Sequence, residues 1–278
     1  MQIEVIIEKK SHKLDAEEGK TILETLQEHG IHVLTAPCGG RGRCGKCTVE
    51  VEHMGEVLAC MTKVTDGMRI TIPKVQLRAQ KSKIAENGTV THYPADDGEG
   101  LDAACDIGTT TVVCHLIDGK TGEKLATVSE PSAQRSFGAD VLSRIQAAEA
   151  GKLEILKEQI IFQIAQMLRT LQKKTGRGEQ IQRLAVVGNT VMCHLFAGIS
   201  PVSIGVTPFM PQEFFGKEYT GEQLGLTDCR SVYIAPAVAG FVGGDITSDL
   251  LAVMQKKPKD KVLLLDIGTN GEMAVGNE

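Results

Sequence analysis

Four cysteines in the first quarter of the chain constrain its fold more than any other feature. They follow the spacing Cys38-x5-Cys44-x2-Cys47-x12-Cys60, so three share one short segment and the fourth comes from a separate one. Four thiolates suit either a zinc ion or a 2Fe–2S cluster, and the number of cysteines does not separate these two centres. The fold must in either case bring the two segments together.

Glycines between the cysteines favour the cluster. The loop contains Gly39, Gly40, Gly42 and Gly45. A loop with so little side-chain bulk lets backbone N–H groups turn toward bridging sulfides and stabilise the negative charge of a cluster. A structural zinc site more often has two C-x-x-C pairs, whereas only Cys44 and Cys47 have that spacing here. We therefore predict a 2Fe–2S cluster on Cys38, Cys44, Cys47 and Cys60, with zinc or reduced free thiols as the alternatives.

The remaining cysteines have no comparable spacing. They are Cys105, Cys114, Cys193 and Cys229. The chain opens with an alternating strand pattern, MQIEVIIEKK, and not with a secretory signal, which predicts a cytoplasmic location where thiols stay reduced. We therefore expect these four cysteines to be buried free thiols that pack as small hydrophobic side chains.

Charge and hydropathy argue against two classes of partner. The formal net charge is −5 over 278 residues, which does not suit binding to nucleic acid or to an anionic membrane. The longest weakly polar stretch, residues 232–244, contains Pro236 and is too short to span a bilayer. We expect neither a nucleic-acid partner nor a membrane partner.

The first hundred residues predict a small domain and a linker. Residues 1–78 show short alternating strands and one amphipathic helix that begins near Lys20 and ends at Gly30, an order that suggests a β-grasp fold. Residues 79–100 have few apolar side chains and many Gly, Asn and Asp residues, which is typical of a linker.

From residue 101 the pattern is that of a larger α/β domain. We predict an apolar hairpin (103–118), a strand (124–130), a helical region broken at Ala150-Gly151 (138–174), a strand (184–188), a helix (190–197), a strand (231–235) and a helix (246–255). The order β-β-β-α-β-α-β-α over residues 101–257 is that of one ribonuclease-H-like lobe. Residues 258–278 begin again with a strand, a turn and a strand.

A tetrapeptide recurs at the start of both of these regions. Asp106-Ile-Gly-Thr and Asp266-Ile-Gly-Thr each stand between two apolar strands, 160 positions apart. A glycine at such a bend brings backbone N–H groups and threonine hydroxyls close to phosphate oxygens, and the aspartate can hold Mg²⁺ through water. One copy could be a mere hairpin turn, but two copies in like surroundings indicate a duplicated fold.

The duplicated turn resembles the actin-like ATPase superfamily, in which two lobes clasp ATP between their hairpins. The resemblance implies a first phosphate turn made of Asp106, Gly108, Thr109 and Thr110. It implies a second one made of Asp266, Gly268, Thr269 and Asn270. It assigns no catalytic residue for ATP hydrolysis.

Three shorter motifs have competing interpretations. Gly188-Asn189-Thr190 ends a strand and begins a helix, where it could hold a phosphate or its attacking water, or where Asn189 or Thr190 could simply cap the helix. Asp245 is interpreted as an N-cap, with a catalytic role as the alternative. Gly119-Lys120-Thr121 looks like part of a P-loop, but Cys114 occupies the position of the required earlier glycine, so we exclude a P-loop there.

A ferredoxin joined to an actin-like ATPase resembles the reductive activators of corrinoid proteins. Further stretches that carry this resemblance are Gln134 with residues 137–141, residues 187–192 and residues 243–245. The resemblance implies ATP-dependent reduction of Co(II) to Co(I) in a corrinoid protein of a methyltransferase system, with electrons from an upstream low-potential donor. The alternatives are an electron carrier or docking module without ATPase activity, and an actin-like kinase with an attached redox sensor.

Members of that family continue for several hundred residues past the second phosphate turn. We therefore expect this chain to be a truncated activator with little ATPase activity. Its final hairpin, residues 261–275, is expected to lack partner helices.

Overall fold

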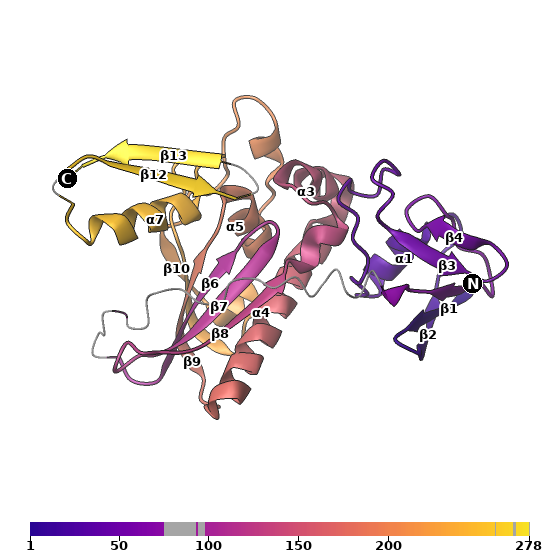
Figure 1. The fold of residues 1–278 in the computed structure, drawn as a ribbon, viewed down its shortest axis with the longest axis horizontal. Coiled ribbons are helices and arrows are strands. Elements are labelled where there is room, and N and C mark those ends of the chain that lie inside the picture. Colours follow the sequence, from indigo (N-terminus) through magenta and orange to yellow (C-terminus); the bar gives the residue numbers. More distant parts are fainter. Residues whose placement is uncertain (75–92, 94–97, 259, 269–270, 278) are drawn as a thin grey trace. The chain divides into compact units, whose positions relative to one another are not determined.

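The computed structural model describes residues 1–74, 93, 98–258, 260–268 and 271–277, which belong to two compact units (Figure 1). Unit 1 consists of Met1–Lys83 and Ala133–Ala147, and unit 2 consists of Ile84–Ser132 and Ala148–Glu278. Most of the linker predicted at residues 79–100 lies outside the described residues. Within the described part of the chain, no helix is both long and apolar enough to cross a membrane.

Unit 1 contains a five-stranded sheet with the strand order β2-β1-β5-β3-β4. Its strands are β1 (Gln2–Ile7), β2 (Lys10–Asp15), β3 (Thr48–Val51), β4 (Gly55–Leu58) and β5 (Arg69–Thr71). Strands β1 and β5 pair in parallel and the other neighbours are antiparallel, which confirms the predicted β-grasp fold. Ile3 and Val5 of β1 alternate into the core, which is the period expected of a half-buried strand.

The helix of unit 1, α1 (Ile22–Glu28), packs Ile22, Leu23 and Leu26 into the core, as the sequence predicts. It begins with a capping box: the Thr21 hydroxyl accepts from the Glu24 N–H, and the Glu24 carboxylate accepts from the Thr21 N–H. Such a box satisfies two N–H groups that a helix start otherwise leaves open, and so fixes where the helix begins.

The predicted long helical region is interrupted, as expected, at Ala150-Gly151. It consists of α3 (Val141–Ala147), a single irregular turn (Ala148–Lys152) and α4 (Leu153–Thr175). Gly151 has a φ of 83°, a left-handed conformation that glycine adopts without steric penalty. The irregular turn begins where unit 1 ends and unit 2 resumes.

Unit 2 contains a six-stranded sheet with the order β10-β11-β9-β6-β7-β8. Its strands are β6 (Leu101–Ile107), β7 (Thr111–Asp118), β8 (Lys124–Pro131), β9 (Ile181–Val187), β10 (Lys217–Thr220) and β11 (Cys229–Ile234). Strands β6, β9 and β11 run in parallel, and β7, β8 and β10 extend the two edges in antiparallel pairing. This topology is that of the predicted ribonuclease-H-like lobe, with β10 as an additional edge strand.

Helix α4 packs against β7, β8 and α5 (Thr190–Ala197). Its buried stripe matches the predicted one: Leu156, Ile160, Ile164, Leu168 and Leu171 are all fully buried. Each such side chain contributes roughly 1.5–3 kcal/mol when it leaves water. Two further helices, α6 (Gly221–Leu224) and α7 (Gly244–Met254), follow β10 and β11.

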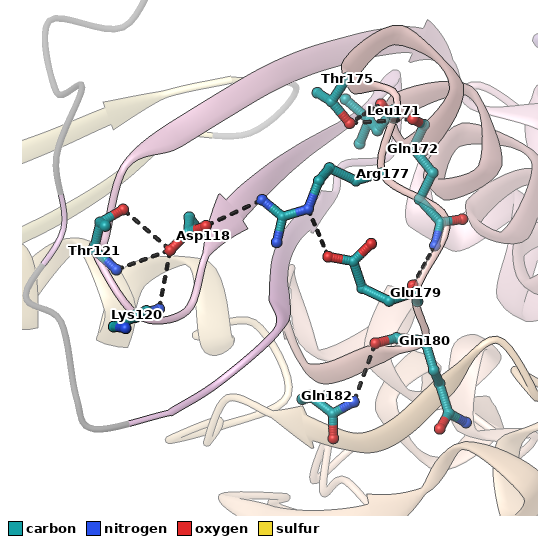
Figure 2. Close-up of polar contacts among 10 residues, drawn as sticks. All are labelled: Asp118, Lys120, Thr121, Leu171, Gln172, Thr175, Arg177, Glu179, Gln180 and Gln182. Atoms are coloured by element: carbon teal, nitrogen blue, oxygen red, sulfur yellow. Dashed lines mark hydrogen bonds and ion pairs between the residues drawn. The ribbon is translucent and has the colours of Figure 1, made fainter.

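A polar network joins the β7–β8 turn to the segment after α4 (Figure 2). Arg177 donates to Asp118 at 3.1 Å and to Glu179 at 2.5 Å. The other carboxylate oxygen of Asp118 accepts from the backbone N–H groups of Lys120 and Thr121. The Gly-Lys-Thr fragment is thus a hairpin turn closed by Asp118, which agrees with its exclusion as a P-loop.

A disulfide crosses the β6–β7 hairpin and corrects one expectation. Cys105 and Cys114 face each other in the antiparallel register, with their Cα atoms 4.2 Å apart, and they are bonded. The prediction of free thiols is therefore wrong for this pair, because the register of the hairpin sets the two side chains opposite each other. Cys193 and Cys229 are buried free thiols, as expected.

The chain's last described hairpin consists of β12 (Val262–Ile267) and β13 (Gly271–Gly276), which form a separate two-stranded sheet. Val262 and Leu264 are half-buried, and β12 contacts α7. The opposite face exposes Leu263, Leu265 and Ile267, the last to 86%. The predicted strand–turn–strand is present, but the expectation that it lacks a partner helix is wrong for the face that contacts α7. The other apolar face is open in the described structure.

Candidate functional site

The cysteine loop of unit 1 runs between α1 and β3, and Cys60 follows β4. The Cys44 thiol lies close enough to Cys38 to lower the pKa of that residue, and the Cys47 thiol lies close enough to Cys60 to raise its pKa, so the thiols form two pairs. Cys47 and Cys60 are buried, whereas Cys38 and Cys44 are partly exposed. The structure thus brings all four predicted ligands together as two pairs.

Backbone donors of the loop point at the sulfur atoms. Gly39, Gly40, Gly42 and Gly45 have φ values of 64°, 82°, 70° and 63°. These left-handed residues fold the loop back, so that the N–H groups of Arg41, Arg43 and Cys44 reach the Cys38 sulfur. The Gly42 N–H reaches the Cys60 sulfur in the same way.

The two pairs differ in how readily a thiol loses its proton. Burial acts to raise the pKa of Cys38, but the Cys44 thiol and the three backbone donors together lower it to about 6. Burial and the neighbouring Cys47 raise the pKa of Cys60 to about 11. A metal centre must displace the proton at Cys60, whereas the loop already favours the charged form at Cys38.

The paired arrangement tests which metal centre fits. A structural zinc ion requires four ligands around one point. Among the residues that the structure describes, no three His, Cys, Asp or Glu side chains surround a single point in this way. Two cysteine pairs suit two iron atoms that each take two thiolates. The donor set therefore fits a binuclear iron–sulfur cluster.

The first phosphate turn of unit 2 joins β6 to β7. A Cβ atom at Gly108 would lie 2.5 Å from the Thr111 carbonyl oxygen, so only glycine fits this bend. The side-chain amide of Asn189 donates to the Thr109 hydroxyl at 2.9 Å, while its oxygen accepts from the Met192 N–H at 3.0 Å. Asn189 is therefore the helix cap of α5 and also a direct partner of the turn.

Two other glycines bring distant segments against this turn. A Cβ at Gly188 would lie 2.7 Å from the Ile107 side chain, and one at Gly243 would lie 2.6 Å from both the Asn189 Cα and the Thr190 nitrogen. The Asp245 N–H donates to the Gly188 carbonyl at 3.2 Å. The ends of β6 and β9 and the start of α7 thus meet at one place.

Carboxylates gather at that place. The Asp106 side chain still reaches solvent but lies deep among surrounding atoms, and burial raises its pKa to about 7, helped by the nearby charges of Asp245, Asp249 and Asp266. Burial also raises the pKa of Asp245, of Asp249 and of Glu272. Such a concentration of negative charge attracts a divalent cation, but no three of these described carboxylates surround one point, so a cation bound here would keep water in much of its shell.

The prediction that Asp245 is an N-cap is wrong. Gly243 occupies the cap position of α7, and Asp245 lies in the first turn with its carboxylate beside Asp106 and Asp266. A glycine pair before the aspartate shifts the start of the helix by two residues. The sequence reasoning also missed Asp249, although its i, i+4 spacing from Asp245 places both on one face of the helix.

The second phosphate turn is described only in part. Asp266 is the penultimate residue of β12 and lies near Asp106, and Gly268 forms a bend after the strand. Thr269 and Asn270 lie outside the described residues.

Two family models match this arrangement of a cysteine loop followed by a phosphate-turn lobe. Residues 4–74 match the 2Fe-2S iron-sulfur cluster binding domain, and residues 101–257, which are over half of the chain, match the RACo middle region. The chain belongs to the RACo family. Unit 1 is accordingly a 2Fe–2S domain.

Similar proteins agree with this family. The corrinoid activation enzyme RamQ of Eubacterium limosum is 29% identical over 88% of this chain and 54% of its own length. A [Co(II) methylated amine-specific corrinoid protein] reductase of Methanosarcina barkeri is 28% identical over 62% of this chain and 33% of its own. The RACo-family chain described here thus spans about half of the first relative and a third of the second.

A solved structure supports the fold across both units. The reductive activator for corrinoid,iron-sulfur protein has a TM-score of 0.61 and 25% identity, and the match covers 99% of this chain and 61% of that one. It bears out the predicted fold class, a β-grasp ferredoxin domain followed by an actin-like lobe, and the predicted membership of the reductive activators.

Proposed function

We propose that Cys38 and Cys44 hold one iron of the 2Fe–2S cluster and that Cys47 and Cys60 hold the other. The pairing of the thiols and the match over residues 4–74 support this assignment. When bound, such a cluster carries a single electron. The backbone N–H groups of the glycine loop stabilise negative charge at the sulfur atoms and thereby influence the reduction potential.

The lobe of unit 2 is proposed to hold the phosphates of ATP with Mg²⁺. Gly108, Thr109 and Thr110 face the phosphates from the first turn, and Gly268, Thr269 and Asn270 face them from the second. Asp106 and Asp266 hold the cation, directly or through water. The convergence of carboxylates beside a glycine turn supports this placement, because the cation offsets charges that otherwise repel one another.

Together these sites make the protein an ATP-dependent reductive activator of a corrinoid protein. The observation that carries this proposal is the presence of an iron–sulfur loop and a phosphate-turn lobe in one chain of the RACo family. The partner is a corrinoid protein of a methyltransferase system whose cobalt has oxidised to Co(II). One electron from an upstream low-potential donor converts Co(II) to Co(I), with no proton required, and ATP drives this uphill step.

An anaerobic assay tests the proposal. Protein reduced with dithionite and freed of excess reductant is mixed with a Co(II) corrinoid protein, and the absorption of Co(I) is followed with and without Mg-ATP. We expect Co(I) to form only with Mg-ATP, and not at all with the Cys60→Ser variant. Equal Co(I) formation with and without nucleotide would remove ATP from the proposed function.

A second candidate is electron transfer without ATP hydrolysis, in which unit 2 serves as a docking module. The exposed apolar face of β12 and β13 favours it, because an exposed apolar surface of this kind is suited to docking of another protein. Phosphate release during the same assay separates the candidates. Co(I) formation that consumes no ATP supports the second one.

A further inference from the structure

A segment from the middle of the chain packs on the cysteine loop within unit 1. Residues 133–147, here called the clamp, consist of a 3₁₀ turn (Ala133–Ser136), a connection and α3. The Ala139 N–H donates to the carbonyl of Pro37, the residue before Cys38, at 3.2 Å. The side-chain amide of Gln27 in α1 donates to the Ser136 carbonyl at 2.9 Å, and this contact is buried.

The clamp also lies against the loop beyond Cys38. A Cβ at Gly39 would be 3.1 Å from the Phe137 carbonyl oxygen and 3.7 Å from the Ser143 Cβ. The rings of His32 and Phe137 are 6.4 Å apart. The backbone on both sides of one proposed cluster ligand is therefore in contact with the clamp, whereas Cys60 is held by other parts of unit 1.

Internal contacts give the clamp a defined shape. Arg144 is fully buried and donates to the Gln134 side chain at 3.2 Å. The Asp140 carboxylate accepts from the Ser143 N–H at 2.7 Å. At Gly138, with a φ of 149°, a Cβ would lie 2.1 Å from the Ser143 Cβ. These contacts limit the number of shapes that the segment can adopt.

The clamp starts immediately after a residue that is bound to the first phosphate turn. In unit 2, the Ser132 N–H donates to the Thr110 carbonyl at 2.9 Å. Four residues later in the chain, Ser136 accepts the hydrogen bond from Gln27. The polypeptide thus passes within a few residues from the phosphate turn to the wall of the cysteine loop.

We propose that the clamp positions the Cys38 side of the cluster loop and transmits ligand binding at the phosphate turn to it. This inference rests on the proposed nucleotide site. Binding of Mg-nucleotide shifts Thr110 and with it Ser132, and the clamp passes the shift through Ser136 and Ala139 to Pro37 and Gly39. Gln27 is the positioning residue, because its amide holds the clamp on α1.

Coupling of this kind is reciprocal. If nucleotide changes the reduction potential of the cluster, reduction must change the affinity for nucleotide by the same factor. An allosteric coupling at the low end of the usual range is about fivefold. For a one-electron centre a fivefold change corresponds to about 41 mV, at about 59 mV for each factor of ten.

The test uses the full chain and two glutamine variants. Gln27→Met keeps the side-chain volume and removes the donor to Ser136. Gln172→Met is the matched control, because Gln172 donates in the same way to a backbone carbonyl, that of Glu179 in unit 2, at 2.8 Å (Figure 2). For each protein, equilibrium dialysis gives the Mg-ATP affinity in the oxidised and dithionite-reduced states. Redox titration gives the potential with and without Mg-ATP, and visible circular dichroism reports the cluster environment.

We expect wild type and Gln172→Met to show about a fivefold affinity difference between redox states. In Gln27→Met that difference should fall below about twofold, with nucleotide still bound and an altered dichroism spectrum. Nucleotide binding by the wild type with no change at the cluster would overturn the inference and leave the proposed nucleotide site intact. Absence of nucleotide binding in both redox states would overturn the proposed nucleotide site together with this inference, and this result is distinguishable from the previous one. A full coupling in Gln27→Met would reject the clamp as its route.

Discussion

The cysteine loop and the phosphate turn both depend on glycine, but for different reasons. Gly40, Gly42 and Gly45 provide left-handed backbone conformations that turn N–H groups toward sulfur. Gly108 and Gly243 provide space, because a Cβ at Gly108 would lie 2.5 Å from the Thr111 carbonyl oxygen in the same turn and one at Gly243 would lie 2.6 Å from the backbone of Asn189. The first site is made by the shape of one loop, and the second by the close approach of segments that are far apart in sequence.

The two sites also differ in the charge that they are built to hold. Backbone donors surround the sulfur atoms of the cysteine loop and favour the thiolate at Cys38. At the phosphate turn, burial raises the pKa of Asp106, and the nearby charges of Asp245 and Asp266 raise it further, so protonation is favoured. The cysteine loop is therefore prepared for an anionic centre, whereas the phosphate turn requires a cation before it can accept an anionic ligand.

The largest effect is expected from a substitution that disrupts only the cysteine loop. Cys60→Ser removes the ligand that comes from outside the loop, so we expect loss of the cluster and of its visible absorption. Iron and sulfide analysis of anaerobically purified protein should give about two of each per chain in wild type and far less in the variant. Cys229→Ser, at a buried free thiol of unit 2, is the control and should keep its iron. Stoichiometric zinc in wild type grown with ample iron contradicts the assignment.

The next largest effect is expected from a substitution that disrupts only the phosphate turn and its surroundings. Gly243→Ala places a Cβ against the backbone of Asn189 and Thr190, and we expect it to destabilise unit 2 by about 3 kcal/mol, as overpacking against a rigid neighbour does. Gly178→Ala is the matched control, since nothing lies within 4 Å of its added Cβ, and its effect should stay within about 0.5 kcal/mol. Urea unfolding followed by far-ultraviolet circular dichroism measures both.

Visible absorption of the cluster serves as an internal reporter in that experiment. We expect Gly243→Ala to leave it unchanged in native buffer, because unit 1 has its own core. Equal stability of the two glycine variants would show that α7 moves freely relative to β9.

The same contrast explains what the sequence predicts and what it does not. The cysteine loop is recognisable from spacing because Cys38, Cys44 and Cys47 lie within ten residues and their glycines lie between them. Strong periodicity likewise predicts α4 and its stripe, since a helix repeats its buried positions every three to four residues. Strand β2 is harder to locate from the sequence, because its residues, KSHKLD, bury only one side chain and its pairing with β1 supplies the order.

The phosphate turn is recognisable only in part. The repeated Asp-Ile-Gly-Thr gives the turn, but the approach of Gly243 to Asn189 depends on the whole lobe and leaves no local pattern. Asp245 was misread for that reason: an aspartate at a helix start usually caps it, and here the tertiary structure turns it toward Asp106. The register that pairs Cys105 with Cys114 is likewise set by the turn geometry, which the sequence shows only indirectly.

An intermediate effect is expected from the loss of the Cys105–Cys114 disulfide, which lies beside the phosphate turn. Unfolded protein kept anaerobic and unreduced should show six reactive thiols once the cluster is removed, and eight after reduction. Cys114→Ser should lower the stability of unit 2 by about 2 kcal/mol, because the nine-residue loop gains freedom in the unfolded chain. The visible spectrum of the cluster should not change. Eight thiols without reductant would show that the pair is reduced in solution.

The smallest expected effect sharpens the electrostatic side of the comparison. The pKa of Asp106 is raised from 3.8 to about 7, so between these values the folded state keeps a proton that the unfolded state has lost. The contribution of the Asp106 carboxyl to the stability of the fold is fully present below pH 3.8 and is lost as the pH rises through about 7. Above that pH, folding requires an ionised carboxylate to lie among other carboxylates. Removing the charge by Asp106→Asn should therefore stabilise unit 2 most at pH 8, less at pH 5 and hardly at all below pH 3.8. Since the side chain also reaches solvent, which screens the repulsion, we expect a gain of roughly 1 kcal/mol.

Asp118→Asn provides the control of opposite sign. Backbone N–H groups of the hairpin turn and the Arg177 guanidinium lower the pKa of Asp118, so its charge stabilises the fold above the unfolded value and is lost in acid. Asp118→Asn should accordingly weaken the fold at pH 8 and matter less as pH falls toward 3.

Urea midpoints at pH 5 and pH 8, with and without Mg²⁺, compare the two variants. Mg²⁺ should stabilise wild type at pH 8 and leave Asp106→Asn almost unchanged, because the cation replaces the proton that the carboxylates compete for. Stabilisation of both proteins by Mg²⁺ to the same extent would place the cation away from the phosphate turn.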